Sequence, residues 1–256
     1  MDVISVEALK KLQDFAVQHL ANSFWSFAKL VVMNRKLVDA IAAEALQRLG
    51  NFEPQAMTNT VWSLATLGIK NEELLQAIGA QAKLRIEEYG PQDIGNTAWA
   101  FAKLGVVNQQ IMEILGQAAM KKLRQFLPQE ITNTAWAFAT LSISNTPLFL
   151  EISVKALPRI GEFDPQGLSN LTWACATVSF HDSALMSALS SESIVKIQHF
   201  LPQNLGNTVW ALAKMSIQDF QLLHAAAAAS LSCILEHKPQ EISNTAWALA
   251  KLGFKH

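Results

Sequence analysis

The segment NTAWAFAKLG, at residues 96–105, returns as NTAWAFATLS at residues 133–142 and as NTAWALAKLG at residues 244–253. These are three copies of a longer pattern marked by 7 tryptophans, each of which lies 37 residues after the one before it. The tryptophans are Trp25, Trp62, Trp99, Trp136, Trp173, Trp210 and Trp247. A fixed period of this length is typical of helical repeats that stack side by side and share one hydrophobic core.

Each copy carries the start and stop signals of two helices. Six copies contain a Pro-Gln pair whose proline suits the first position of a helix, while the first copy has Val17 in its place. This first helix is predicted to end at Gly68, Gly105 and Gly253, or at a serine in the same position. Nine residues after each of the first six tryptophans an asparagine or aspartate provides an N-cap for a second helix, which should end near an aromatic residue.

We therefore expect an all-α protein, an α-solenoid (superhelix) of tandem 37-residue helix-turn-helix repeats, since no segment alternates with the period of a strand. The expected organisation is a single solenoid over residues 1–256. A partial leading repeat at 1–16 is followed by full repeats at 17–53, 54–90, 91–127, 128–164, 165–201 and 202–238 and by a partial trailing repeat at 239–256. Neither end has the polar cap of a terminal repeat, which predicts an excerpt of a longer array or ends that meet a protein partner.

Composition and motifs favour binding over catalysis. The formal net charge of −1 means that any contact with nucleic acid has to come from a local arrangement of charges. The 6 histidines and 2 cysteines occupy unrelated positions in the repeat, without a metal motif or a glycine-rich phosphate loop. We expect no enzyme activity, no metal, no cofactor and no small-molecule substrate. The sequence also has no apolar run long enough to span a membrane and no visible targeting segment.

A polar stripe follows the first helix of every repeat. At about 100° per residue, a glutamine, an asparagine and a position that is always Lys or Thr fall on one narrow arc beside the indole. Stacked repeats would turn this arc into a ladder, and we predict that RNA contacts its rungs. The Lys/Thr rungs are Lys29, Thr66, Lys103, Thr140, Thr177, Lys214 and Lys251. The amide rungs are Asn22, Asn59, Asn96, Asn133, Asn170, Asn207 and Asn244.

Structural explanations compete with this prediction. A buried amide that bonds the neighbouring repeat would also recur in every copy, so both explanations stay open for the asparagines. The glutamine lies in the first turn, where it could cap free N–H groups, and the indole suits packing between repeats better than ligand stacking. The Lys/Thr position is different, because a core needs neither residue.

The second helix carries a column of basic residues, twenty-three residues after each tryptophan, which we interpret as a phosphate-binding track. Its members are Lys11, Arg48, Arg85, Lys122, Arg159 and Lys196, and Cys233 takes the same position in the last copy. The alternative is a solvated face of ion pairs, because Glu7, Glu44 and Glu192 lie four residues before a basic member. Such surface pairs contribute only ~0.3–0.5 kcal/mol each, too little to explain the column by stability alone.

The unit PQ-x-(I/L)-x-N-T-(A/V)-W-(A/S)-(F/L)-A-(K/T)-L-G resembles the octotricopeptide repeat, which is related to the FAST-kinase-type and RAP-domain proteins of organelles. The resemblance covers essentially the whole chain. It implies a helical-hairpin array in a mitochondrion or chloroplast, in which each first helix contacts about one nucleotide of single-stranded RNA. The period is one residue shorter than the family name implies, and the first and fifth copies depart from the pattern at Val17, Ser23, Leu171 and Cys175.

The expected function is sequence-selective binding of single-stranded RNA, in organellar RNA processing, stability or translation. Two alternatives stay open. One is a scaffold that binds peptides or proteins, since amides beside indoles can also hold an extended peptide backbone. The other is a structural subunit of an organellar ribonucleoprotein.

Overall fold

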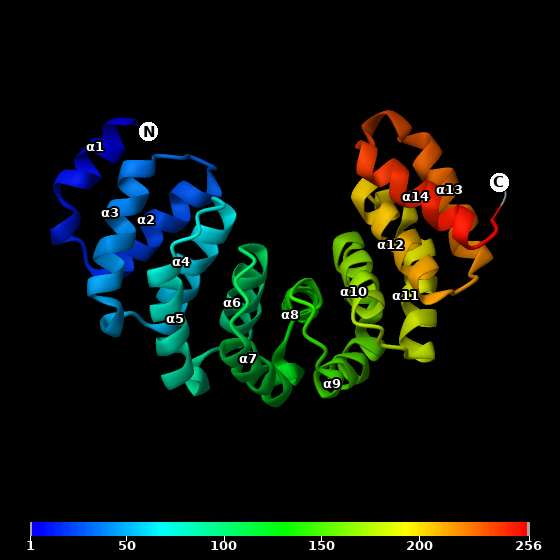
Figure 1. The fold of residues 1–256 in the computed structure, drawn as a ribbon, viewed down its shortest axis with the longest axis horizontal. Coiled ribbons are helices and arrows are strands. Elements are labelled where there is room, and N and C mark those ends of the chain that lie inside the picture. The colour runs from blue at the N-terminus through cyan, green and yellow to red at the C-terminus, as the bar shows by residue number, and fades with distance from the viewer. Residues whose placement is uncertain (1, 255–256) are drawn as a thin grey trace. The chain divides into compact units, whose positions relative to one another are not determined.

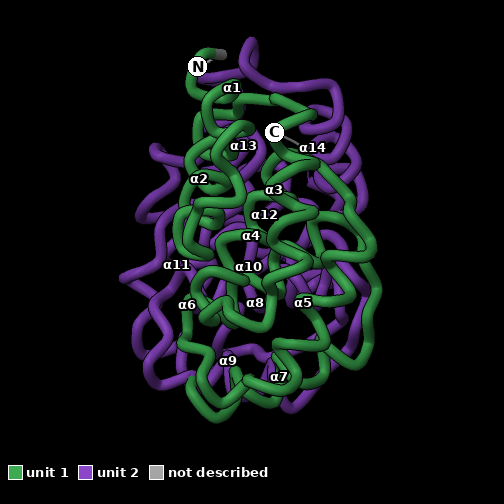
Figure 2. The backbone as a smooth tube through the Cα atoms, turned by 90° about the vertical axis from the view of Figure 1, so that its left-hand side faces the viewer, with its two compact units in different colours: residues 1–122 green, residues 123–256 purple. Residues whose placement is uncertain are grey.

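The computed structural model describes residues 2–254 and is an all-α solenoid (Figure 1). In this described part the chain forms α-helices and short 3-10 turns, with no strand. The first helices begin at residues 17, 54, 91, 128, 165, 202 and 239, so the sequence period is also the structural period. The final two positions of the trailing repeat, 255 and 256, lie outside the described residues. Two compact units are distinguished, residues 1–122 and 123–256, drawn in different colours in Figure 2.

Unit 1 contains the leading helix α1 (Asp2–Lys10), which is followed along the chain by three complete helix pairs. Its first helices, α2 (Val17–Lys29), α4 (Pro54–Thr66) and α6 (Pro91–Lys103), pack in a row, α2 on α4 and α4 on α6. The second helices, α3 (Arg35–Gln47), α5 (Glu72–Leu84) and α7 (Gln109–Lys122), form a parallel row that begins with α1. Each helix therefore contacts its equivalent in the next repeat, as stacking requires.

Unit 2 repeats this arrangement. Its first helices are α8 (Pro128–Thr140), α10 (Pro165–Thr177), α12 (Pro202–Met215) and α14 (Pro239–Lys251), each packed on the next. Its second helices are α9 (Thr146–Ala156), α11 (Ser183–Lys196) and α13 (Phe220–Ser232), of which α11 packs on α13. The core between the two rows consists of leucine, isoleucine, phenylalanine and alanine side chains.

The predicted helix signals act as expected. Proline opens six of the first helices, and the N-cap side chain of the second helix accepts a backbone N–H three residues on, for example Asn71 from Leu74 at 3.0 Å. Gly68, Gly105 and Gly253 end first helices with φ between 63° and 68°, the left-handed region that glycine enters without strain. Ser142, Ser179, Ser216 and Val31 take the same conformation in the other copies.

The second helix differs from the prediction at its end. It stops before the aromatic residue, at the basic column, where Arg48 and Arg85 have φ of −113° and −118°. A 3-10 turn follows and leads to an aromatic side chain such as Phe52 or Tyr89, which is fully buried. The turns are η1 (Leu12–Asp14), η2 (Leu49–Asn51), η3 (Ile86–Glu88), η4 (Leu123–Gln125), η5 (Leu157–Glu162), η6 (Ile197–His199) and η7 (Ile234–Glu236). Within residues 2–254 no helix is both long enough and apolar enough to cross a bilayer.

Candidate nucleic-acid interface

The tryptophans form a ladder along the row of first helices. In unit 1 the ring centroids of Trp25 and Trp62, and of Trp62 and Trp99, are 6.4 Å apart, with interplanar angles of 33° and 29°. In unit 2 Trp173 and Trp210 are 6.3 Å apart at 32°. These contacts between rings of successive repeats confirm that the indoles pack between repeats. Each indole nevertheless keeps part of its surface in solvent, since none of the seven tryptophans is fully buried.

The amide side chains lie beside this ladder. All seven glutamines of the Pro-Gln or Val-Gln pairs are exposed, and the asparagines are half-buried except for exposed Asn22. Capping of the first turn is performed by a different residue, one position after the glutamine: Asp93, Glu130, Asn204 and Glu241 accept the backbone N–H at the N-cap of their helices. The glutamines of these copies are therefore not needed for that capping bond.

The Lys/Thr rungs separate into two kinds. The four lysines, Lys29, Lys103, Lys214 and Lys251, are exposed, and the Nζ of Lys251 lies 5.0 Å from the ring centroid of Trp247. The threonine hydroxyls are turned away from solvent. Thr177 donates to the carbonyl of Trp173 at 2.8 Å, and the hydroxyl oxygens of Thr66 and Thr140 are buried. A helical threonine can bond its own backbone in this way, which the Lys/Thr alternation did not reveal.

The basic column joins successive repeats. Five of its members donate a hydrogen bond to the backbone carbonyl thirty-three residues earlier, at the aromatic residue that ends the preceding 3-10 turn. These bonds are Arg48 to Phe15 (2.7 Å), Arg85 to Phe52 (2.6 Å), Lys122 to Tyr89 (2.6 Å), Arg159 to Phe126 (2.8 Å) and Lys196 to Phe163 (2.7 Å). We call this contact the cation–carbonyl bond. Lys11, in the leading fragment, is exposed.

Ion pairs accompany the cation–carbonyl bond. Arg48 pairs with Glu44 at 3.2 Å and Lys196 with Glu192 at 2.9 Å, the partners that the sequence indicated. These four side chains are only 16–27% exposed, so they do not form a solvated face. Glu7 departs from that prediction and pairs with Lys10, not Lys11. Arg159 and Arg85 hold glutamates three residues on, and hydrogen bonding to Arg159 lowers the pKa of the Glu162 carboxyl.

These contacts supply a structural reason for the basic column that sequence reasoning missed. The carbonyl that ends each 3-10 turn needs a donor from outside its own turn, and a long cation from the next repeat reaches it. The signal was present as the constant spacing between the basic residue and the preceding aromatic. The phosphate-binding role of the column stays a prediction, and it competes with bonds that these head groups already make.

Comparison with protein families gives two matches to one family, described as RNA-editing substrate-binding complex 6 protein. The matches cover residues 1–143 and residues 108–256. The chain belongs to this family. Together the two matches span the whole chain, and they overlap in its middle, as a chain of near-identical repeats allows. A search of curated proteins gave no match.

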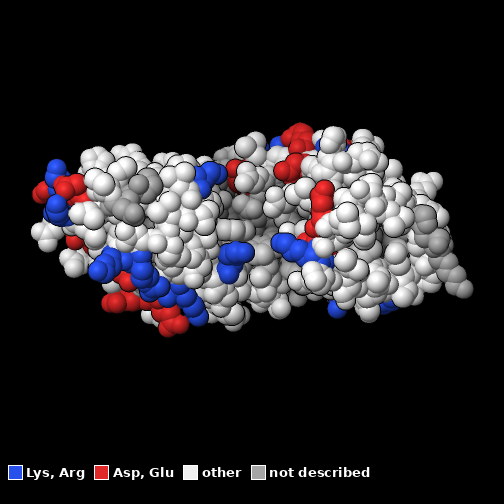
Figure 3. All heavy atoms as spheres, turned by 90° about the horizontal axis from the view of Figure 1, so that it is seen from above, with Lys and Arg blue, Asp and Glu red and all other residues white. Residues whose placement is uncertain are grey.

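Membership of the RNA-editing substrate-binding complex 6 family confirms the coarser part of the sequence-based expectation, an RNA-binding helical-repeat protein of RNA processing. The sequence alone did not indicate that this processing is RNA editing. The narrower resemblance to octotricopeptide repeats stays a prediction. On the face that Figure 3 shows, Lys and Arg lie next to Asp and Glu in several places, among a majority of uncharged residues. The four rung lysines differ from the basic column, because they are exposed and lie on the same helices as the indoles and amides.

Proposed function

We propose that the chain binds single-stranded RNA along its first helices, with selectivity for sequence, and serves organellar RNA editing by holding an RNA substrate. The observation that carries this proposal is the ladder of partly exposed indoles flanked by exposed glutamines, half-buried asparagines and exposed lysines. Family membership supports the RNA partner and a complex with other proteins. RNA-editing complexes of this kind are mitochondrial, which favours the mitochondrion over the chloroplast.

The proposed mechanism assigns a separate task to each kind of side chain. Exposed indole surface gives unpaired bases an apolar platform, and base stacking on aromatic side chains contributes ~1–3 kcal/mol per base. Amides next to the indoles offer both a donor and an acceptor, which is what reading a base edge requires. The lysines neutralise phosphates. The hydroxyl oxygens of Thr66 and Thr140 are buried and the hydroxyl of Thr177 bonds its own backbone, so we assign the reading of bases along the ladder to the amides. No catalytic step is proposed.

A salt titration tests the electrostatic part. If four exposed lysines each neutralise one phosphate, log K for a single-stranded oligonucleotide should fall with log salt at a slope of about −3, since each contact contributes about −0.7. The probe is a random-sequence 20-nucleotide RNA in a filter-binding assay. Absence of binding at low salt would remove the RNA function.

A double variant tests the lysines themselves. Lys103→Ala with Lys214→Ala should weaken RNA binding and reduce the salt slope by about 1.4, because two phosphate contacts are lost. The matched control is Lys83→Ala with Lys155→Ala, which removes the same charge from the second helices α5 and α9. Equal losses in the two double variants would mean that only total charge matters and that the rung lysines have no special place.

The rival function is a scaffold for an extended peptide, and the near-neutral net charge of −1 favours it. Amides beside indoles suit a peptide backbone as well as a base edge. A structural subunit of an organellar ribonucleoprotein combines both contacts. The salt titration separates the RNA-binding function from the peptide scaffold, because a peptide-binding face gives no RNA affinity with the slope described above.

A further inference from the structure

Polar bridges join neighbouring first helices near their N-terminal ends. The amide nitrogen of Asn204, in α12, donates to the hydroxyl of Ser169 in α10 at 3.1 Å, and both groups are buried. The hydroxyl of Thr58, in α4, lies 3.3 Å from the hydroxyl of Thr97 in α6. Burial raises the pKa of Asp93, also in α6, and the nearby Gly90 N–H and Thr58 hydroxyl partly offset the rise. In both cases the hydroxyl four residues before one tryptophan bonds a polar side chain of the next first helix, on which Asn204 and Asp93 lie six residues before the following tryptophan.

The pair α8 and α10 lacks this bridge. Gly167 occupies the position of Asp93 and Asn204, and Thr132 occupies that of Thr58 and Ser169. Thr132 is only 4% exposed, and within the described residues its hydroxyl has no hydrogen-bond partner. A Cβ at Gly167 would lie 3.4 Å from that hydroxyl oxygen, so the two positions face each other directly. A buried hydroxyl without a partner costs free energy, which a bound ligand can recover.

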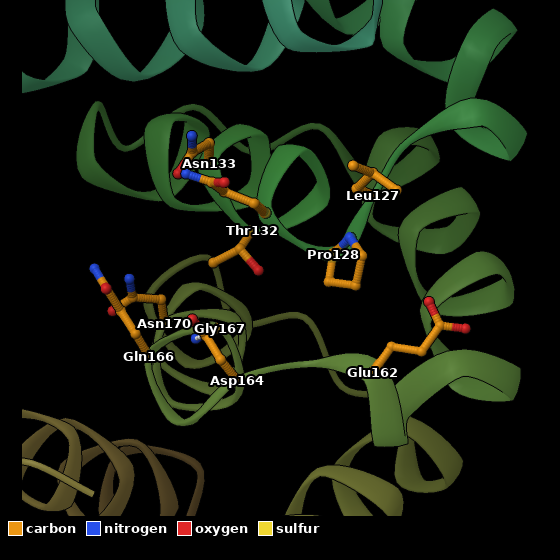
Figure 4. A pocket seen from close by; sticks show the side chains of 10 residues that line it. Leu127, Pro128, Thr132, Asn133, Glu162, Asp164, Gln166, Gly167 and Asn170 are labelled. Atoms are coloured by element: carbon orange, nitrogen blue, oxygen red, sulfur yellow. Dashed lines mark hydrogen bonds between the residues drawn. The ribbon is translucent and has the colours of Figure 1, made fainter.

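The missing bridge leaves a cleft of about 380 Å³ between the two helices. Asn133, Gln166 and Asn170 lie on one side of it, and Leu127, Pro128 and Glu162 on the other, with Thr132 and Gly167 between them (Figure 4). Gln129 and Asp164 complete the lining. The size lies within the usual range of small-ligand sites, roughly 300–1,000 Å³.

The lining selects the chemistry of the ligand. The lining has two carboxylates but no Lys or Arg. The hydrogen bond with Arg159 lowers the pKa of Glu162, which keeps this carboxyl charged. The cleft therefore disfavours a phosphate. Four amides, a hydroxyl and two carboxylates suit a planar group that both donates and accepts hydrogen bonds. Carboxylates accept from the exocyclic amino groups of bases. Adenine, cytosine and guanine have such a group, whereas uracil presents two carbonyls and one N–H.

We propose that this cleft is a base-selective subsite that takes a base with an exocyclic amino group in preference to uracil. The proposal rests on the RNA-binding function proposed above and assigns part of its selectivity to one repeat junction. Gly167 keeps the cleft open and the Thr132 hydroxyl bonds the inserted base. Glu162 is already bonded to Arg159 and Asp164 accepts the Gly167 N–H at 2.6 Å, so the remaining lone pairs of these carboxylates accept the amino group, which uracil lacks.

The test fills the cleft with the residues that the next repeat has at the same positions. Asp164→Leu with Gly167→Asn copies the Leu201 and Asn204 pair of the next repeat, which gives Thr132 a partner and removes the space. Affinities for 12-nucleotide oligo(A), oligo(C) and oligo(U) are measured by fluorescence anisotropy at one salt concentration. The natural chain should prefer oligo(A) and oligo(C) over oligo(U) by about tenfold. The filled variant should lose most of this preference and keep its affinity for oligo(U).

A second variant guards against a folding defect. Thr132→Val removes only the buried hydroxyl, and it should leave thermal stability unchanged or higher while it lowers the preference about fivefold, the value of one hydrogen bond. Circular dichroism checks that both variants keep their helices. Equal affinity of the natural chain for the three oligonucleotides, or an unchanged preference in both variants, overturns the subsite and leaves the RNA function standing. No binding to any oligonucleotide overturns both.

Discussion

Replacing Arg159 with alanine removes one cation–carbonyl bond between successive repeats of unit 2. The guanidinium donates to the carbonyl of Phe126 at 2.8 Å and also holds Glu162 at 2.7 Å. The carbonyl bond is the contact that spans two repeats, whereas Glu162 lies in the turn that contains Arg159 itself. We therefore expect the carbonyl bond to account for most of the loss.

The magnitude follows from the charge of the donor and its partial exposure. A hydrogen bond to a charged group contributes ~1.5–3 kcal/mol. The Arg159 side chain is 29% exposed, so water can reach part of the vacated space and the lower end applies. We expect a loss of about 1.5 kcal/mol in the free energy of unfolding, which for a chain of this length lowers Tm by about 3–6 °C.

Urea unfolding followed by circular dichroism measures this loss, with two control variants. Glu162→Gln removes the ion pair but keeps the bond to Phe126, and its effect should be small because Glu162 is exposed. Arg159→Lys should keep most of the stability, since Lys196 makes the equivalent bond at 2.7 Å. The reasoning fails if Arg159→Ala costs no more than Glu162→Gln. If Arg159→Ala instead left the stability unchanged and made the salt slope of RNA binding smaller by about 0.7, the phosphate-binding role of the column would be favoured again.

Three further outcomes are expected. Val31 has φ of 53°, a conformation that costs a branched residue ~1–2 kcal/mol, so Val31→Gly should raise the stability to urea by about 0.5–1 kcal/mol after the entropy of glycine is subtracted; a loss would contradict this. The last copy of the basic column has Cys233 and therefore no cation to bond the carbonyl of Phe200. Cys233→Arg should add this cation–carbonyl bond and raise the free energy of unfolding by about 1 kcal/mol. An unchanged urea midpoint would count against it. The hydrogen bond from the Ser153 hydroxyl lowers the pKa of Asp182. This carboxylate therefore stabilises the fold above its unfolded pKa of about 3.9, and the contribution is lost as pH falls. Acid unfolding should show that Asp182→Asn loses less stability between about pH 5 and 3 than the natural chain does.

The fold could be predicted from the sequence because every repeat starts and ends its helices with the same residue types at the same positions. The proline at the start, the N-cap asparagine and the glycine or serine at the end each act over a few residues, so their effect can be read without knowing the partner repeat. The break between second helix and 3-10 turn was missed. It occurs at the position of the basic column. Cys233, which has no cation, breaks its helix there with φ of −124°, close to the −113° and −118° of Arg48 and Arg85, so the cation–carbonyl bond is not required for the break.

The candidate site was predictable in composition but not in orientation. The position of Lys103 and Thr140 on one arc of the helix followed from helical geometry, yet only the structure shows that the Thr140 hydroxyl is buried and that the lysine is exposed. The role of Gly167 could not be foreseen either. A glycine inside a helix carries no side chain to interpret, and its importance comes from the unpartnered Thr132 on the neighbouring helix.

The spacing of the indole ladder has a consequence for the RNA itself. The indole pairs Trp25–Trp62, Trp62–Trp99 and Trp173–Trp210 are 6.3–6.4 Å apart. This is nearly twice the rise of about 3.4 Å per base along each strand of a stacked duplex. A strand that places one base at each indole has to be stretched until its bases no longer touch one another. If the chain binds RNA as proposed above, it would therefore favour unpaired strands and compete with hairpins for them.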